Sequence, residues 1–224
     1  PAGVDGRPPG VHYVQVYRRC CGRAECPTCY EVWASKEAKR AEHRIRAYKP
    51  VRYRSPVHVA VSVPSRLYGL EFVKLRVKAR QIARKAGLVG GCSIFHPFRF
   101  DVESKASYWS PHFHILGYGW VVGTDRLYED TGWVVRNKGV RRSVKATLSY
   151  LLSHAGVHKG RHTVTWWGAL SYNKLSVAPL EPERHFCPMC GLELRPFLLA
   201  EGLDPPDQVG TYYLDDGRFV SWDL

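Results

Sequence analysis

The chain has 224 residues and a formal net charge of +13, from 33 basic and 20 acidic side chains. This length suits one main core with a small addition and is too short for two large domains. Apolar residues make up 45% of the chain and charged residues 24%, which excludes a wholly disordered protein. The positive surplus indicates a phosphate-rich or otherwise anionic partner.

The cysteines and the hydropathy of the sequence indicate in which cellular compartment the protein works. Seven cysteines is an odd number, and five of them lie in short spacings typical of zinc ligands. This pattern favours an intracellular, cytoplasmic metalloprotein over a disulfide scaffold. The sequence contains no run of 18 apolar residues and starts without a signal-peptide pattern, so we expect no membrane contact.

The hydrophobic pattern predicts an α+β fold. A basic helix is expected from about residue 31 to 48, before Pro50. Apolar residues then alternate with a period of two or recur with helical spacing. The order β-α-β-β-α-β predicts a ferredoxin-like, split βαβ antiparallel sheet with helices on one face. The expected elements are strand 57–63, helix 70–86, strands 92–101 and 112–122, a strand piece 133–136, helix 144–154 and strand 162–170.

These elements predict three parts of the chain. Residues 1–49 hold a zinc knuckle and the basic helix, and residues 50–176 form the main core. Residues 177–224 carry a second knuckle and a tail that we expect to pack on the N-terminal segment.

The sharpest pattern is a histidine pair in a predicted strand. His112 and His114 flank Phe113, and because residues i and i+2 share a face, both imidazoles project together while Phe113 and Ile115 face the opposite side. Two neutral imidazoles make half of a divalent metal site. The third ligand is either His96, on the preceding strand, or Glu103, in the connecting loop; three ligands leave positions open for catalysis.

The predicted helix 144–154 carries a candidate nucleophile. Tyr150 and His154 are spaced i, i+4 and share a helix face. A tyrosine beside a metal and basic groups can act as a nucleophile, and His154 and Lys145 are candidates to assist it. Tyr172 is the next candidate nucleophile.

Two Cys-Pro-x-Cys turns predict structural Zn²⁺. In the simplest solution Cys26 and Cys29 join Cys187 and Cys190 in one site that staples the ends of the chain together. The competing solution divides the ligands between two sites: Cys21, Cys26 and Cys29 with Cys20 or His43, and Cys187 and Cys190 with His185. Cys92 lies in a strand pattern and is expected in the core.

Basic residues cluster at 36–46, 74–85 and 136–145, the last group directly before the candidate nucleophile, where they suit a nucleic-acid backbone. Four aromatic side chains are candidates to stack on unpaired bases: Tyr108, Trp109, Trp166 and Trp167.

Three stretches resemble the HUH endonuclease superfamily, and within it the rolling-circle replication initiators of plasmids and viruses, including archaeal ones. They are the strand 57–63, the His-hydrophobe-His stretch 111–117 and the helix segment 150–154. The resemblance spans about residues 55–172. Many members place Lys near the tyrosine, where this chain has His154.

The resemblance implies a metal-dependent nickase and ligase of single-stranded DNA. Mg²⁺ or Mn²⁺ on His112, His114 and one further ligand would polarise the scissile phosphate, and Tyr150 would form a 5′-phosphotyrosine and release a 3′-hydroxyl. Position 154 is His, so a single-tyrosine enzyme is expected. The implied partners are single-stranded origin DNA flanked by a hairpin, a helicase and the replication machinery.

Two other functions remain open from the sequence. A non-enzymatic zinc-ribbon protein that binds nucleic acid would keep the cysteines and the charge but make the histidine pair incidental. An HUH transposase or relaxase would keep the chemistry and act on a different DNA.

Overall fold

The structure is a computed structural model that describes Cys21 and residues 23–158 and 160–181 in full, together with the backbone of strands 12–13, 211–215 and 218–221. The chain forms two compact units, residues 20–180 and residues 1–19 with 181–224. Cys20, His185, Cys187 and Cys190 lie outside the described residues, and so does the knuckle predicted for the tail.

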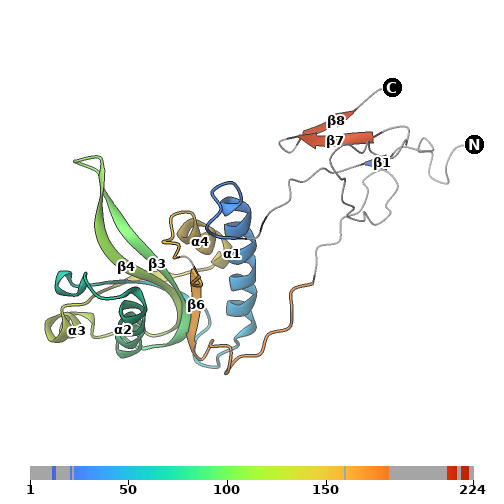
Figure 1. Cartoon of the computed structure of the whole chain (residues 1–224). Helices are drawn as coiled ribbons and strands as arrows, with labels where there is room; N and C mark the ends of the chain where they lie inside the picture. The colour runs from blue at the N-terminus through green and yellow to red at the C-terminus, as the bar shows by residue number, and fades with distance from the viewer. Residues whose placement is uncertain are drawn as a thin grey trace, which may run out of the picture. The chain divides into compact units, whose positions relative to one another are not determined.

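The larger unit is built on a five-stranded antiparallel sheet with the strand order β5-β2-β4-β3-β6 (Figure 1). The predicted α+β class and antiparallel sheet are therefore confirmed. The strands are β2 (Val57–Ser62), β3 (Leu88–Asp101), β4 (Ala106–Gly119), β5 (Val134–Val140) and β6 (Val164–Gly168). β3 and β4 form a hairpin much longer than predicted, whose far end projects beyond the helices (Figure 1).

Helices cover both faces of this sheet, so the expectation of helices on one face was wrong. One apolar cluster joins α2 (Phe72–Lys85) and α3 (Thr124–Thr131) to strand residues such as Val61 and Phe113. A second joins α1 (Tyr30–Ala47) and α4 (Val144–Leu152) to Ile94 and Leu116. The reason is the strand pattern: Phe113 and Ile115 are buried on one face, as predicted, and Leu116 and Tyr118 are buried on the other.

Helix α1 belongs to this unit because its apolar stripe is part of the second cluster. Ala34, Ala38, Ala41 and Ile45 are all buried against the sheet and α4, at the helical spacing that the sequence predicted. The boundary predicted at residue 49 therefore does not separate α1 from the core. Helix α3 was not predicted; it begins after Gly123 and ends at Gly132, both with positive φ.

In the smaller unit, β1 (His12–Tyr13) pairs in parallel with β7 (Thr211–Asp215), which pairs with β8 (Arg218–Ser221). Backbone near the start of the chain thus pairs with the tail. Among the residues that the structure describes, every helix is too short or too polar to cross a lipid bilayer.

Candidate metal centre and its tyrosine helix

Three imidazoles converge on the face of the sheet that α1 and α4 cover. His112 pairs with His96 across β3 and β4, and His114 lies two residues further along β4. One ring nitrogen of each lies within 4.8 Å of the other two, and the ring centroids of His96 and His114 are 4.4 Å apart. The structure thus brings His96, of the two proposed third ligands, to the histidine pair.

Hydrogen bonds leave one nitrogen of His96 and one of His112 free. His96 Nε2 lies 2.8 Å from the carbonyl of Leu151, and His112 Nδ1 lies 2.8 Å from the carbonyl of Ser110. A carbonyl only accepts, so these two nitrogens carry the protons in the neutral rings. His96 Nδ1 and His112 Nε2 therefore keep lone pairs for a metal. Such outer hydrogen bonds are the usual way in which a ligating histidine is oriented.

His114 is held by a fourth histidine, which the sequence analysis missed. His58 on β2 places Nε2 2.7 Å from His114 Nδ1, and its ring centroid is 4.9 Å from that of His114. The sequence did indicate the face on which His58 lies, because the alternation in β2 puts it opposite Val57 and Val59. The sequence did not predict that β2 pairs with β4. This pairing makes His58 a diagonal neighbour of His114.

Arg141 contacts the other side of His58. Its Nη2 lies 3.3 Å from His58 Nδ1, and arginine can only donate. If Arg141 donates, the His58 proton lies on Nε2 and points at His114 Nδ1. Metal binding through His114 Nε2 needs the reverse, with His114 Nδ1–H donating to His58 Nε2. The Arg141–His58 hydrogen bond and metal ligation by His114 therefore compete.

Burial keeps these histidines uncharged. Desolvation lowers the pKa of His96 to about 3 and that of His58 to about 4, and nearby cations and histidines add to the effect. Desolvation also holds the pKa of His112 and His114 below the ordinary value. Neutral imidazoles have the lone pairs that a metal requires, so the donor set fits a divalent ion.

These pKa shifts predict that the metal-free protein loses stability in mild acid. The unfolded chain titrates its histidines near pH 6.5, whereas the folded pKa values of His58 and His96 are about 4 and about 3. Below pH 6.5 the unfolded chain therefore binds more protons, and unfolding becomes easier as pH falls. We expect the melting temperature in EDTA to drop by at least about 4 °C between pH 7 and pH 5. His96→Gln should make the melting temperature depend less steeply on pH. If the melting temperature of this variant falls as steeply as that of the wild type, the buried neutral His96 is not a source of the effect.

Tyr150 and His154 lie on the same side of the sheet as the histidine cluster. The ring of His154 is 4.7 Å from that of Tyr150 and 4.9 Å from that of His96, between centroids. Tyr150 is 65% exposed, so its phenol is open to a substrate. The helix thus brings the predicted tyrosine next to the predicted metal ligands, with His154 between them.

Ser153 orients His154. Its hydroxyl donates to the Tyr150 carbonyl at 2.8 Å, so its oxygen accepts from His154 Nδ1 at 2.7 Å. Because the His154 proton lies on Nδ1 and burial lowers the pKa of this ring, Nε2 has a free lone pair at neutral pH. That atom can accept a proton or contribute to a metal site.

Glu103, Lys145 and Tyr172 are not brought to this cluster. Glu103 is exposed in the turn of the β3–β4 hairpin, seven residues beyond His96, and β3 carries the chain away from the histidines as far as Asp101. Lys145 is exposed in the first turn of α4, about 140° around the helix from Tyr150. Tyr172 lies beyond β6, with the guanidinium of Arg44 4.3 Å from its ring centroid.

Arg99 is a second residue that sequence reasoning missed. Its Nη2 donates to Ser62 Oγ at 2.6 Å, and its charge helps to lower the pKa of His112. Its Nε is buried and has no hydrogen-bond partner among the described residues. A buried donor of this kind suits an anionic oxygen beside the histidines.

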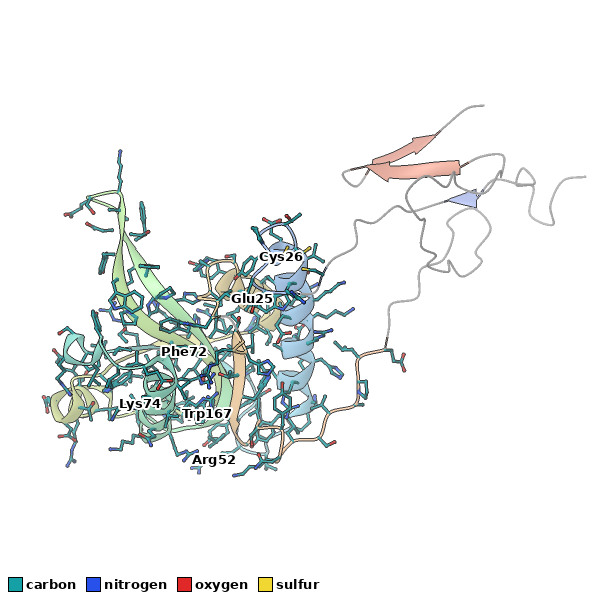
Figure 2. The ribbon with its side chains drawn as sticks, in the orientation of Figure 1. Glu25, Cys26, Arg52, Phe72, Lys74 and Trp167 are labelled. Atoms are coloured by element: carbon teal, nitrogen blue, oxygen red, sulfur yellow. The ribbon has the colours of Figure 1, made fainter. Side chains whose placement is uncertain are left out.

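The proposed stacking aromatics divide into two groups. Tyr108 and Trp109 are exposed on the β3–β4 hairpin, where Trp109 packs edge-on against Phe98 with centroids 5.5 Å apart. Trp167 is buried in the α2 face of the core (Figure 2). Trp166 packs against the α1 face.

A separate thiol cluster precedes α1. The Sγ atoms of Cys21, Cys26 and Cys29 lie within 4.8 Å of one another, in the turn that leads into the helix (Figure 2). The Cys29 backbone N–H and the thiols of Cys21 and Cys29 lower the pKa of Cys26, which favours the thiolate that binds Zn²⁺. His43 lies about 20 Å further along α1 and hydrogen-bonds the Ala178 carbonyl. Cys92 is buried in the core, as expected.

Removing one of these thiols is expected to remove bound zinc. In Cys26→Ser, zinc per chain measured by elemental analysis should fall by about one equivalent, because three thiolates no longer surround the ion. Cys92→Ala is the control, because burial raises the pKa of that thiol to about 12 and keeps it protonated. Unchanged zinc in Cys26→Ser would exclude this cluster as the site.

No protein-family model, curated protein or solved structure matches this chain.

Proposed function

We propose that this protein is a metal-dependent nuclease of the HUH type, which nicks and rejoins single-stranded DNA at a specific sequence. The observation that carries the proposal is the convergence of His96, His112 and His114 with Tyr150, through the ring of His154. These side chains come from two strands and a helix that lie far apart in the sequence.

The residues support phosphoryl transfer to tyrosine. The Tyr150 oxygen attacks the phosphorus, its proton passes to His154 Nε2 and then to solvent, and a phosphotyrosine ester forms. The bond from phosphorus to the 3′ oxygen breaks, and that oxygen takes a proton from solvent to become a 3′-hydroxyl. Arg99 lies beside His112 and would pair with a non-bridging phosphate oxygen. Attack by the 3′-hydroxyl on the phosphotyrosine reverses the reaction.

The ligand chemistry favours Mn²⁺ over Mg²⁺. Mg²⁺ prefers oxygen ligands, whereas imidazole nitrogens suit transition-metal ions. His96 Nδ1, His112 Nε2 and His114 Nε2 would hold the ion. The bound ion would act as a Lewis acid on the scissile phosphate.

The topology supports the same family. Strands β2, β3, β4 and β5, with α2 after β2 and α3 after β4, have the order β5-β2-β4-β3. This is the order of a ferredoxin-like sheet, to which β6 is added at the β3 edge. A role in initiating rolling-circle replication, rather than transposition or conjugation, rests on the sequence resemblance.

A covalent-adduct assay tests the proposal. The full chain is incubated with single-stranded DNA of random and candidate origin sequence, labelled at its 3′ end because tyrosine stays attached to the 3′ fragment, with Mn²⁺, with Mg²⁺ or with EDTA. We expect a labelled species that survives SDS, forms more with Mn²⁺ than with Mg²⁺ and is absent in EDTA. DNA binding without any adduct would instead favour the non-enzymatic zinc-ribbon function.

A further inference from the structure

We infer that a cleft beside the metal centre binds one deoxynucleotide of the single-stranded substrate, next to the scissile phosphate. This inference rests on the proposed function and adds a specificity subsite to it. The cleft has a volume of about 410 Å³ and lies between the end of α1, the segment 48–56 and the start of α4. Tyrosine rings line it together with five basic side chains: Arg46, Lys49, Arg54, Arg141 and Arg142.

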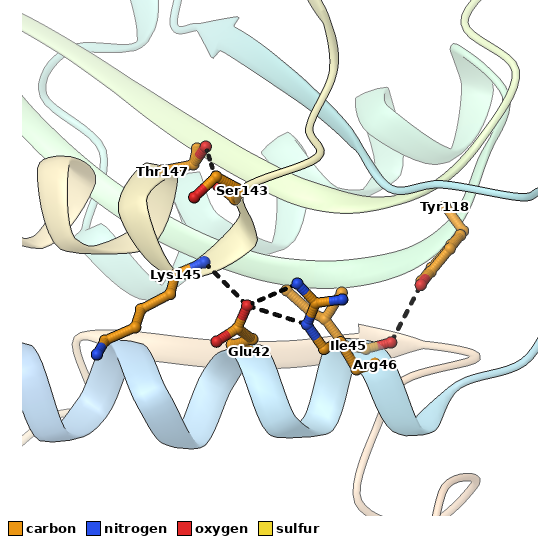
Figure 3. A network of polar contacts seen from close by, with 7 residues as sticks. All are labelled: Glu42, Ile45, Arg46, Tyr118, Ser143, Lys145 and Thr147. Carbon is orange, nitrogen blue, oxygen red and sulfur yellow. Dashed lines mark hydrogen bonds and ion pairs between the residues drawn. The ribbon is translucent and has the colours of Figure 1, made fainter.

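The charge of the cleft favours an anion. Five cationic side chains line it and no carboxylate does, among the residues that the structure describes. Arg46 already has a partner, since Glu42 Oε1 lies 2.9 Å from its Nη2 and also accepts from the Lys145 backbone N–H at 3.3 Å (Figure 3). Within the described part of the chain, the other four cations form no ion pair. A phosphate would supply the missing negative charge.

The aromatic rings make the ligand a nucleotide rather than a bare phosphate. The Tyr118 hydroxyl donates to the Ile45 carbonyl at 3.1 Å (Figure 3), and its ring packs edge-on against Tyr48, with centroids 5.2 Å apart. These contacts fix Tyr48 at the cleft wall, and Tyr53 lines the same cleft half-buried. Tyrosine rings beside guanidinium groups are typical of sites where unpaired bases stack and phosphates pair with arginine.

Arg141 links the cleft to the metal centre. It lines the cleft, and its Nη2 is 3.3 Å from His58, which in turn lies 2.7 Å from His114. Two side chains, Arg141 and His58, therefore connect a nucleotide in the cleft to the ligand His114. This position suits a nucleotide neighbouring the one that is cut.

The test measures binding of a fluorescein-labelled single-stranded oligonucleotide to the full chain by anisotropy, in EDTA, over a range of salt. We expect Arg54→Gln with Arg142→Gln to weaken binding at least about 10-fold and to reduce the salt slope by about 1.4, or 0.7 for each lost cation. Tyr53→Ala should weaken binding further, and Tyr53→Phe should restore it, because phenylalanine keeps the stacking ring.

The matched control removes two charges elsewhere. Lys74 and Lys78 are exposed on α2, which packs on the opposite face of the sheet (Figure 2), so Lys74→Gln with Lys78→Gln changes the net charge equally. An equal loss of affinity in this control would overturn the inference, as would equal displacement of the oligonucleotide by polyglutamate.

The adduct assay separates this inference from the proposed function. If the wild-type chain forms the adduct while the cleft variants bind and react like it, the cleft inference fails and the nuclease stands. If the cleft variants lose DNA binding but the wild-type chain never forms an adduct, the cleft binds nucleotides and the nuclease proposal fails.

Discussion

Tyr150→Phe is expected to abolish the covalent adduct while leaving DNA binding within about two-fold of the wild type. Phenylalanine lacks the oxygen that attacks phosphorus, so adduct formation should fall at least about 10³-fold. The side chain is 65% exposed, so losing the hydroxyl leaves the fold intact. The measurement is the yield of SDS-resistant labelled protein with Mn²⁺, alongside anisotropy with the same oligonucleotide.

Tyr172→Phe is the matched control for Tyr150→Phe. Tyr172 is also strongly exposed, but its ring lies on Arg44 of α1. We expect this variant to form the adduct at the wild-type rate. An adduct that persists in Tyr150→Phe and disappears in Tyr172→Phe would move the nucleophile to residue 172 and remove the role given to His154.

The sequence predicted most of the secondary structure because its apolar spacing is regular. The β2 alternation and the α1 stripe at Ala34, Ala38 and Ala41 lie where the pattern put them. The distribution of helices over the two faces was predicted wrongly, as helices on one face only, because it depends on which face each apolar stripe covers. Tertiary packing determines which face of the sheet each helix covers, and the local spacing of apolar residues does not contain this information.

The sequence predicted only those parts of the site whose residues lie close together in the chain. His112 and His114 share a face by strand geometry, as the spacing predicts. The spacing of Tyr150 and His154 predicted that they lie together, and their rings do, although α4 ends at Leu152 and His154 lies in the turn that follows. The choice of His96 over Glu103 depends on the β3–β4 register, which pairs His96 with His112 and carries Glu103 out to the hairpin turn. His58 and Arg99 join the site through pairings between strands, which no single stretch of sequence contains.

Loss of metal binding is the second large effect that we expect. His114→Ala removes one of three nitrogen ligands, so the affinity for Mn²⁺, measured by titration calorimetry or electron paramagnetic resonance, should fall at least about 100-fold. Adduct formation at limiting Mn²⁺ should fall with it. His158→Ala is the control, because that ring stacks on Phe72, with centroids 4.1 Å apart, on the opposite face of the sheet. Equal Mn²⁺ affinity in wild type and His114→Ala would exclude the three-histidine centre.

Substitutions at His58 and at Arg141 should change the affinity for Mn²⁺ in opposite directions. His58→Phe keeps a ring but leaves His114 Nδ1 without its acceptor, so Mn²⁺ binding should weaken about 10–100-fold. Arg141→Ala removes the donor that competes for His58 Nδ1 and a positive charge close to the centre, so Mn²⁺ binding should tighten. The same Arg141→Ala variant should bind single-stranded DNA more weakly, because it removes a cation from the cleft. A parallel loss of Mn²⁺ and DNA affinity in Arg141→Ala would contradict the competition, since it would mean that Arg141 supports the metal centre rather than opposing it.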